Sequence, residues 1–450
     1  MKMYETTQSV EKYLNVSLEC SCGMTHYAPI KAVNISRNAL SFIPSYMLSL
    51  GHSHPYLLCD SITWKIAGKQ CEQILLSAGY PVYTLILKHA EFDEATLGEI
   101  VLNKPDDCDV MIGCGTGSIT DMLRFSSFKL GVPCFTVATA APMDGFSASV
   151  GIMNVNNVKK TMPAHSTEVF IGDTEILKNA PFRMTLAGFG DLIGKLNSLN
   201  DWRLGVLVND EHICENIATM VHDYVTDIIG KANLLASHDP KTIGDLLNAL
   251  LLTGLTVSLY GSSRAISGAE HHMSHYWEIL GAQRGKPFAM HGEQVAVATV
   301  LTLSLAELLK DCKIDFARAR SYAKTYNHAA WEAEIHRAYG KAAEEILTLQ
   351  SKAMRDSAEN RLRRIDHIEA KWPDIISLLS SLPSSFSLQK LLKSIGCPCT
   401  PLDIGISADI LHDTLLYSKE TRCIYTICQL ISDLGLSEET SEELIRRFSL

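Results

Sequence analysis

Three histidines in the second half of the chain are candidate ligands of a metal ion. His271 and His275 are four residues apart in a predicted helix, so they share one face of it. His291 opens a further predicted helix after the break at Pro287. Two histidines and one carboxylate from different helices, with coordination positions left open, would form a catalytic metal centre. A chain with 16 histidines produces such a spacing by chance, so the spacing alone is weak evidence. Each histidine alone is better explained as a hydrogen-bonded core residue.

A glycine-rich segment precedes these histidines and contains two opposite charges. It reads Gly188-Phe-Gly-Asp191-Leu-Ile-Gly194-Lys195, which places Asp191 and Lys195 on one face of a predicted helix. Each glycine inside a helix costs roughly 1 kcal/mol relative to alanine. This cost predicts a close approach of the helix backbone to another helix or to a ligand.

A second glycine-rich segment, in the first half of the chain, has the features of a phosphate-binding turn. Gly113-Cys-Gly115-Thr116-Gly117-Ser118 follows a predicted strand and opens a predicted helix. Glycines there let a ligand approach the backbone, and the N–H groups of a helix start favour an anion such as a pyrophosphate. The spacing differs from GxGxxG, so a tight strand-to-helix turn without a ligand is an equally good interpretation.

Asp60 stands at the end of an earlier predicted strand. A carboxylate at this place can accept a hydrogen bond from a ribose 2′-hydroxyl and repel a 2′-phosphate, which favours NAD over NADP. It can equally cap the following helix, and the two roles do not exclude each other.

One cysteine cluster stands near the start of the chain, in Cys20-Ser-Cys22-Gly-Met-Thr-His26. Two thiols and an imidazole can bind a metal, but no second cluster of matching spacing follows. A turn of small residues is therefore the favoured interpretation.

The order of predicted elements indicates an α/β domain followed by a helical one. Short apolar runs alternate with amphipathic stretches between residues 56 and 173, which predicts a parallel sheet with helices on both faces. After Pro181 the strand signals stop, and six helices are expected at residues 183–204, 214–237, 246–260, 262–280, 294–309 and 329–354. We expect two domains, residues 1–181 and 182–450, as a length of 450 residues suggests.

The bulk composition restricts the partners and the compartment. A net charge of −10 disfavours non-specific binding to nucleic acid or to an anionic membrane. The best apolar stretch, residues 249–260, is shorter than the roughly 20 residues that span a bilayer. The first residues lack the apolar segment of a signal peptide. We therefore expect a cytoplasmic protein with mostly free thiols.

Taken together, these motifs resemble the sn-glycerol-1-phosphate dehydrogenases, in particular their bacterial branch, within the iron-containing alcohol dehydrogenase superfamily. The resemblance covers nearly the whole chain, from Cys20 to about Gly435. It is carried by the order of these motifs: Gly113-Cys-Gly-Thr116, Ala141-Pro-Met-Asp144-Gly, Gly188-Phe-Gly-Asp191-Leu-Ile-Gly-Lys195, Ser267-Gly-Ala-Glu-His271, Ser274-His275, His291-Gly292 and Arg422-Cys-Ile-Tyr425-Thr426-Ile427.

The resemblance implies an N-terminal Rossmann-like domain, an all-helical second domain and an active site in the cleft between them. It assigns the metal to Asp191, His271 and His291, and the substrate to Asp144, Asp191 and His275. It places the cofactor pyrophosphate on Gly113, Gly115, Thr116 and Gly117, and the nicotinamide against Thr139, Ala140 and Pro142. Catalytic roles would fall to Asp191 and His275, with Lys195 as a partner of Asp191 or of the substrate phosphate.

The chain departs from the family pattern near the cofactor. It reads Thr139-Ala-Ala-Pro142-Met-Asp144-Gly where the family usually has TAPSMDG. Ala148 stands at a cofactor position where serine is common, between Ser147 and Ser149, and Gly117 replaces the usual β-branched residue.

The implied activity is reduction of dihydroxyacetone phosphate to sn-glycerol 1-phosphate, and its reverse, with NAD(H) or NADP(H) and one divalent metal. Zinc and nickel are the metals that the resemblance implies, and iron also suits two histidines and a carboxylate. A homo-oligomer is expected. The alternatives are a polyol dehydrogenase acting on unphosphorylated glycerol, a dehydroquinate synthase-like sugar-phosphate cyclase, and a non-catalytic binding protein.

Overall fold

The computed structural model describes residues 10–89, 91–155, 158–353 and 357–450. The chain forms two compact units, one of residues 1–192 and 226–262 and one of residues 193–225 and 263–450. Helices α7 (Phe182–Asn209) and α8 (Glu215–Gly230) continue through two of the three points where the chain passes from one unit to the other. The division at residues 181 and 182 stays a prediction. The expectation about a signal peptide falls partly on residues 1–9, which lie outside the described residues.

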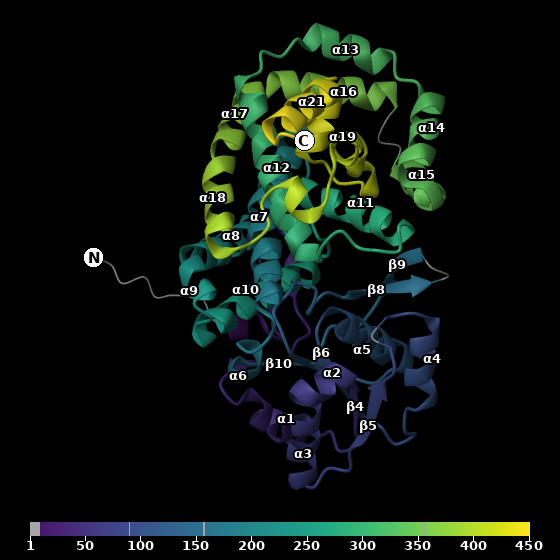
Figure 1. The fold of residues 1–450 in the computed structure, drawn as a ribbon, viewed down its shortest axis with the longest axis vertical. Coiled ribbons are helices and arrows are strands. Elements are labelled where there is room, and N and C mark those ends of the chain that lie inside the picture. The colour runs from purple at the N-terminus through teal and green to yellow at the C-terminus, as the bar shows by residue number, and fades with distance from the viewer. Residues whose placement is uncertain (1–9, 90, 156–157, 354–356) are drawn as a thin grey trace, which may run out of the picture. The chain divides into compact units, whose positions relative to one another are not determined.

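The first unit is built on a six-stranded sheet in which every neighbouring pair of strands is parallel (Figure 1). The strand order is β3-β10-β7-β6-β4-β5. The strands are β3 (Ala32–Ser36), β4 (Pro55–Asp60), β5 (Tyr83–Leu87), β6 (Val110–Gly115), β7 (Cys134–Ala138) and β10 (Val169–Asp173). The parallel sheet predicted from the sequence is confirmed, and β3 adds an edge strand that was not predicted. Two antiparallel hairpins, β1 (Ser17–Glu19) with β2 (Thr25–Tyr27) and β8 (Val150–Val155) with β9 (Val158–Pro163), complete the strands.

Alternate residues of the central strands enter two separate cores. Leu57 and Ile112 pack on one face with helices α1 and α3, whereas Leu58 and Met111 pack on the other face with α4 and α5. Strands buried on both faces read as continuous apolar runs, which is why these strands were visible in the sequence. The helices of this unit are α1 (Ile43–Leu50), α2 (Ser61–Thr63), α3 (Lys69–Ser77), α4 (Glu94–Leu102), α5 (Gly117–Leu130), α6 (Thr174–Leu177), α9 (Ala232–Ala236) and α10 (Pro240–Tyr260), with a π-helical turn, Trp64–Gly68, between α2 and α3.

The strand order reverses between β4 and β6. From β4 the chain moves to β5 on one side, and then returns to β6 on the other side of β4. In open parallel sheets, ligands bind at such a switch point, beyond the carboxyl ends of the strands. Asp60 ends β4 and Gly115 ends β6, so both lie at this edge.

The second unit contains helices and no strand among its described residues. Its helices after α8 are α11 (Ala269–Gln283), α12 (His291–Asp311), α13 (Phe316–Lys324), α14 (His328–Tyr339), α15 (Ala343–Ala353), α16 (Ala358–Ala370), α17 (Trp372–Ser380), α18 (Ser385–Ile395), α19 (Ala408–Tyr417), α20 (Ile427–Asp433) and α21 (Ser437–Arg447). Apolar residues of α11, α12, α14, α19 and α20 form one large core.

Several predicted helices differ from the observed ones. The helix expected over residues 214–237 is divided at Lys231 into α8 and α9. The helix expected from residue 262 begins at Ala269 instead. The helix expected over residues 329–354 is broken at Gly340, whose φ of 49° lies in the left-handed region, into α14 and α15. Its expected end, residue 354, lies outside the described residues.

Helices α10 and α12 are long and apolar enough to cross a membrane by length and composition, although the sequence analysis expected no such segment. Their most apolar 18-residue segments are 78% and 89% buried inside the fold, as in the core helices of a folded domain.

Helix α10 is longer than the predicted helix because it begins at Pro240, after the N-cap Asp239.

Candidate active-site residues

Three histidine rings meet in the second unit, at the start of α12 and along α11. The ring centroids of His271 and His291 are 5.4 Å apart, those of His275 and His291 5.7 Å, and those of His271 and His275 6.2 Å. His271 and His275 lie on one face of α11, as predicted, and His291 is the first residue of α12. The fold therefore gathers the three histidines that the sequence singled out.

The carboxylates of buried Glu270 and half-buried Glu278 fix the orientation of these rings. His271 Nδ1 donates to Glu270 Oε1 at 2.7 Å, and His275 Nδ1 donates to Glu278 Oε2 at 3.2 Å. His291 Nδ1 lies 3.1 Å from Glu278 Oε1. A carboxylate only accepts, so each bond puts a proton on Nδ1 and leaves Nε2 as the ring nitrogen that can bind a metal or a substrate hydroxyl.

The charges of this cluster follow from its burial. Burial lowers the pKa of His275 from its usual 6.5 to about 4, against the pull of Glu278, and the charges of Arg422 and His291 add to the lowering. Burial would raise the pKa of Glu278, but His291 and His275 outweigh it and hold that pKa well below its usual range. At neutral pH the cluster therefore contains an ionised Glu278 beside a neutral His275.

Asp201 on α7 connects two parts of the same unit. Its carboxylate accepts from the backbone N–H of Ala269 at 2.8 Å and of Ile427 at 2.8 Å, so it holds the starts of α11 and α20. Burial, together with the charge of Glu270, raises the pKa of Asp201 to about 7. A buried acid of this kind fixes the helix that presents His271.

Asp191 and Asp144 lie together in the first unit. The backbone N–H of Asp144 donates to Asp191 Oδ2 at 2.8 Å. A Cβ added to Gly188 would lie 1.9 Å from the carbonyl oxygen of Ala141, and one added to Gly254 would lie 2.0 Å from that of Asp144. The loop after β7 is thus held against α7 and α10 at two positions where only glycine fits.

The next turn of α7 belongs to the second unit and packs on the histidine cluster. A Cβ on Gly194 would lie 2.7 Å from Val295 and 3.6 Å from His271 Cε1. Lys195 follows and is fully buried. Gly188 and Gly194 therefore allow close packing against a loop and against two helices, which confirms the prediction of a close approach to another helix.

The glycines of the turn between β6 and α5 have different tasks. Gly113 and Gly115 are strand residues, and a Cβ on them would lie 2.7 Å from Leu123 and 2.5 Å from Ile119 of α5. They therefore let the helix pack on the strand. Gly117 opens the helix, and its N-cap, Thr116, makes no side-chain hydrogen bond to the helix backbone. The first N–H groups of α5 thus have no side-chain cap, as at a helix start that binds an anion.

The remaining cofactor candidates line the same edge of the sheet or the loop that follows it. Asp60 caps α2, since its Oδ1 accepts from the N–H of Ile62 at 2.8 Å and of Thr63 at 2.7 Å. Thr139 and Ala140, which follow β7, are buried, and Pro142 is half-buried. Their contacts with a cofactor stay a prediction.

Position 148 is held by its backbone. The carbonyl of Ala148 accepts from Arg124, and the neighbouring Ser147 hydroxyl donates to the carbonyl of Leu251 at 2.8 Å. Ser147 is therefore used to fix the loop on α10, while Ser149 is exposed.

Sequence reasoning missed Glu278, Glu270 and Arg422. Glu278 stands three residues after His275 and seven after His271, so the helical spacing that selected the histidines would also have selected Glu278. Arg422 was quoted only as part of a motif. Its guanidinium is close enough to lower the pKa of His275, and the residue is exposed.

A family model and several known relatives match this chain. The model of the iron-containing alcohol dehydrogenases matches residues 34–181. The glycerol-1-phosphate dehydrogenase (NAD(P)+) of Halalkalibacterium halodurans is 29% identical over 92% of this chain and 96% of that protein. The enzyme of the same name from Bacillus velezensis is 32% identical over 62% of this chain and 72% of that protein.

Solved structures support the fold. Glycerol dehydrogenase from Schizosaccharomyces pombe superposes with a TM-score of 0.58 at 15% identity, over 93% of this chain and 92% of that one. Maleylacetate reductase from Agrobacterium tumefaciens also gives 0.58, at 14% identity, over 92% and 98%. At these identities the likeness concerns the fold alone, and the sequence relatives decide the family. The chain belongs to the glycerol-1-phosphate dehydrogenase family.

Proposed function

We propose that this chain is a metal-dependent, NAD(P)-linked dehydrogenase that interconverts dihydroxyacetone phosphate and sn-glycerol 1-phosphate. The observation that carries the proposal is the group of His271, His275 and His291, whose rings are fixed by Glu270 and Glu278. Several relatives that match more than nine-tenths of this chain are named glycerol-1-phosphate dehydrogenase (NAD(P)+).

We assign a divalent metal to Asp191, His271 and His291, as the family resemblance implies. The Nδ1 atoms of His271 and His291 donate hydrogen bonds to Glu270 and Glu278. Histidines that bind a metal through Nε2 are commonly held in this way. Asp191 lies three residues before Gly194 on α7, about one helical turn from the glycine that packs on His271. Two imidazoles and a carboxylate suit zinc, nickel or iron.

The sheet edge fits a dinucleotide. The uncapped start of α5, at Thr116 and Gly117, suits the pyrophosphate, and Gly113 and Gly115 let that helix start close to the sheet. Asp60 stands at the end of β4, where a carboxylate can accept a hydrogen bond from a ribose hydroxyl. Its Oδ1 already caps α2. We assign the nicotinamide to the segment of Thr139, Ala140 and Pro142, and further cofactor contact to the backbone at Ala148.

When bound, the nicotinamide supplies the hydride and the metal supplies Lewis acidity that stabilises charge developing on the carbonyl oxygen. The chain contributes orientation and proton transfer. Glu278 holds the Nδ1 protons of His275 and His291. His275 is neutral above about pH 4 and 19% exposed, so its Nε2 can exchange a proton between a substrate hydroxyl and water.

The remaining polar residues position the substrate and balance charge. The Asp144 carboxylate accepts from a substrate hydroxyl, while its backbone N–H holds Asp191. Lys195 is fully buried one turn beyond Asp191, so we assign it to that carboxylate. Arg422 is exposed and its charge contributes to the lowered pKa of His275, so we assign the phosphate of the substrate to its guanidinium.

We further propose that residues 1–181 bind the nicotinamide and residues 182–450 bind metal and substrate, and that the protein acts in the cytoplasm as a homo-oligomer. These assignments follow from the family resemblance.

Oxidation of NADH and of NADPH by metal-reconstituted protein tests the proposed function. We expect turnover with dihydroxyacetone phosphate, none with dihydroxyacetone, and sn-glycerol 1-phosphate as the only enantiomer formed. Preference for the unphosphorylated ketone would instead identify a polyol dehydrogenase with the same metal ligands. Absence of turnover with zinc, nickel and iron alike would contradict dehydrogenase activity and favour a cyclase or a binding protein.

Replacing Arg422 with alanine should raise KM for dihydroxyacetone phosphate by about 10- to 100-fold, because one charge-assisted hydrogen bond to the phosphate is lost. The weak binding of inorganic phosphate as a competitive inhibitor should fall in parallel. The Arg446→Ala variant, which removes a cation that is 70% exposed on α21, serves as the matched control. Equal KM values for Arg422→Ala and the parent protein would remove Arg422 from the phosphate site.

A further inference from the structure

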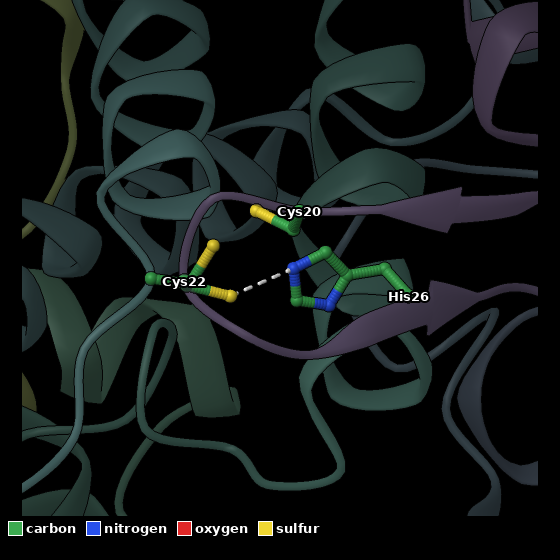
Figure 2. A group of neighbouring side chains, drawn as sticks. Cys20, Cys22 and His26 are labelled. Carbon is green, nitrogen blue, oxygen red and sulfur yellow. Dashed lines mark hydrogen bonds between the residues drawn. The ribbon is translucent and has the colours of Figure 1, made fainter.

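The hairpin formed by β1 and β2 gathers two thiols and an imidazole that the proposed dehydrogenase reaction does not use. Cys20 follows β1, Cys22 lies in the turn, and His26 is the middle residue of β2 (Figure 2). The sulfur atoms of Cys20 and Cys22 and a ring nitrogen of His26 lie within 4.8 Å of one another. In Figure 2 the three side chains turn toward a common centre.

The backbone of the turn is built to present both cysteines on one side. Gly23 has a φ of +86°, the left-handed region that glycine adopts without strain. Its N–H donates to the carbonyl of Cys20 at 3.0 Å, and the N–H of Cys20 donates to the carbonyl of Met24 at 3.2 Å. The turn of small residues that the sequence favoured is therefore present, and it also brings the thiols together.

The His26 ring is fixed in the tautomer that a metal requires. Its Nδ1 donates to the backbone carbonyl of Leu259, on α10 of the same unit, at 2.7 Å. A carbonyl only accepts, so Nδ1 carries the proton and Nε2 has a lone pair. That Nε2 lies 3.4 Å from Cys22 Sγ. The His26 side chain is buried, so the lone pair faces the thiols inside the protein.

We propose that Cys20, Cys22 and His26 bind a divalent metal ion at a structural site separate from the catalytic metal. Two thiolates and an imidazole favour zinc as that ion. Two thiolates and an imidazole Nε2 whose Nδ1 is held by a carbonyl are typical zinc ligands with their supporting hydrogen bond. The ion joins the hairpin to the end of α10. Structural zinc is four-coordinate, so one position is completed by a further thiolate of the chain or by water.

Cobalt substitution of the full-length protein distinguishes this site from the catalytic one. The proposed catalytic ligands are nitrogen and oxygen only, so an intense thiolate-to-cobalt charge-transfer band in the near ultraviolet reports the hairpin site alone. We expect this band in the parent protein and its loss in Cys20→Ser and Cys22→Ser. Zinc content should fall from about two ions to about one per chain in these variants.

Two controls keep the test decisive. The Cys312→Ser variant removes a half-buried thiol at the end of α12, and it should keep the band and both ions. Asp191→Asn should keep the band while losing the other ion. If the Cys20 and Cys22 variants do not fold, X-ray absorption of the zinc-loaded parent protein decides, because two or more sulfur ligands on part of the zinc are expected.

Three results would overturn the proposal. One is a parent protein that shows no thiolate band and no zinc–sulfur scattering. A second is zinc content that stays unchanged in Cys20→Ser and Cys22→Ser. A third is a disulfide between Cys20 and Cys22 found by mass spectrometry of protein purified with zinc; the structure has none among the described residues.

Discussion

Replacing Asp191 with alanine should remove the catalytic metal and lower kcat by about a thousandfold or more, since the Lewis acidity that is lost contributes several kcal/mol to the barrier. Asp191 would be the only anionic ligand of the proposed set beside His271 and His291. Metal content after desalting, measured together with NADH oxidation on one preparation, checks both effects.

The isostere Asp191→Asn separates the metal role from the structural one. Asp191 Oδ2 accepts from the Asp144 N–H at 2.8 Å, and an asparagine oxygen can keep that bond without the negative charge. We therefore expect Asp191→Asn to retain the thermal stability of the metal-free parent and still to lose metal and turnover. Full metal content and full activity in Asp191→Ala would show that the metal assignment is wrong.

The central strands were predictable because their own residues carry the signal. Leu57 and Leu58 enter opposite cores, as do Met111 and Ile112, so β4 up to Cys59 and all of β6 are uncharged and buried on both faces. Strand β3 (Ala32–Ser36) is only half-buried and pairs with β10 alone, at the edge of the sheet. Its stability comes from a partner far along the chain, which a local pattern does not reveal.

The candidate site, too, was predictable only where the signal is local in the sequence. The helical spacing of His271 and His275 predicted a shared face, and the structure adds Glu278 on that face. By contrast, the partners of Asp201 are the N–H groups of Ala269 and Ile427, at distant positions in the chain. Nothing local to Asp201 marks it as a buried acid, because its burial and its raised pKa exist only in the folded protein.

The sequence predicted that the glycines of α7 allow a close contact, but it did not identify the neighbouring residue. The sequence analysis took their cost as a sign of close approach to another helix or to a ligand. At Gly188 the neighbour is the carbonyl of Ala141, in the loop after β7. The same loop carries Asp144, so a residue that looks structural in the sequence positions a proposed substrate ligand.

Replacing Gly188 with alanine should therefore affect both stability and activity. The added Cβ would lie 1.9 Å from the Ala141 carbonyl oxygen and 3.0 Å from Leu250 Cδ1, and a backbone oxygen cannot rotate away. The loop must move, which we expect to destabilise the protein by about 1–3 kcal/mol, well beyond the helix propensity gained. A shift of about 1 Å at Asp144 should lower kcat/KM by about a hundredfold.

Gly98→Ala is the matched control, because Gly98 also lies inside a helix, α4, with no atom within 4 Å of an added Cβ. There alanine should stabilise the protein by up to about 1 kcal/mol and leave kcat/KM unchanged. Urea unfolding and initial rates of the two variants, measured side by side, separate the effect of helix propensity from the steric contact with the Ala141 carbonyl. A Gly188→Ala protein as stable and active as Gly98→Ala would mean that the loop of Asp144 is free to shift, and that its contact with α7 does not set the geometry of catalysis.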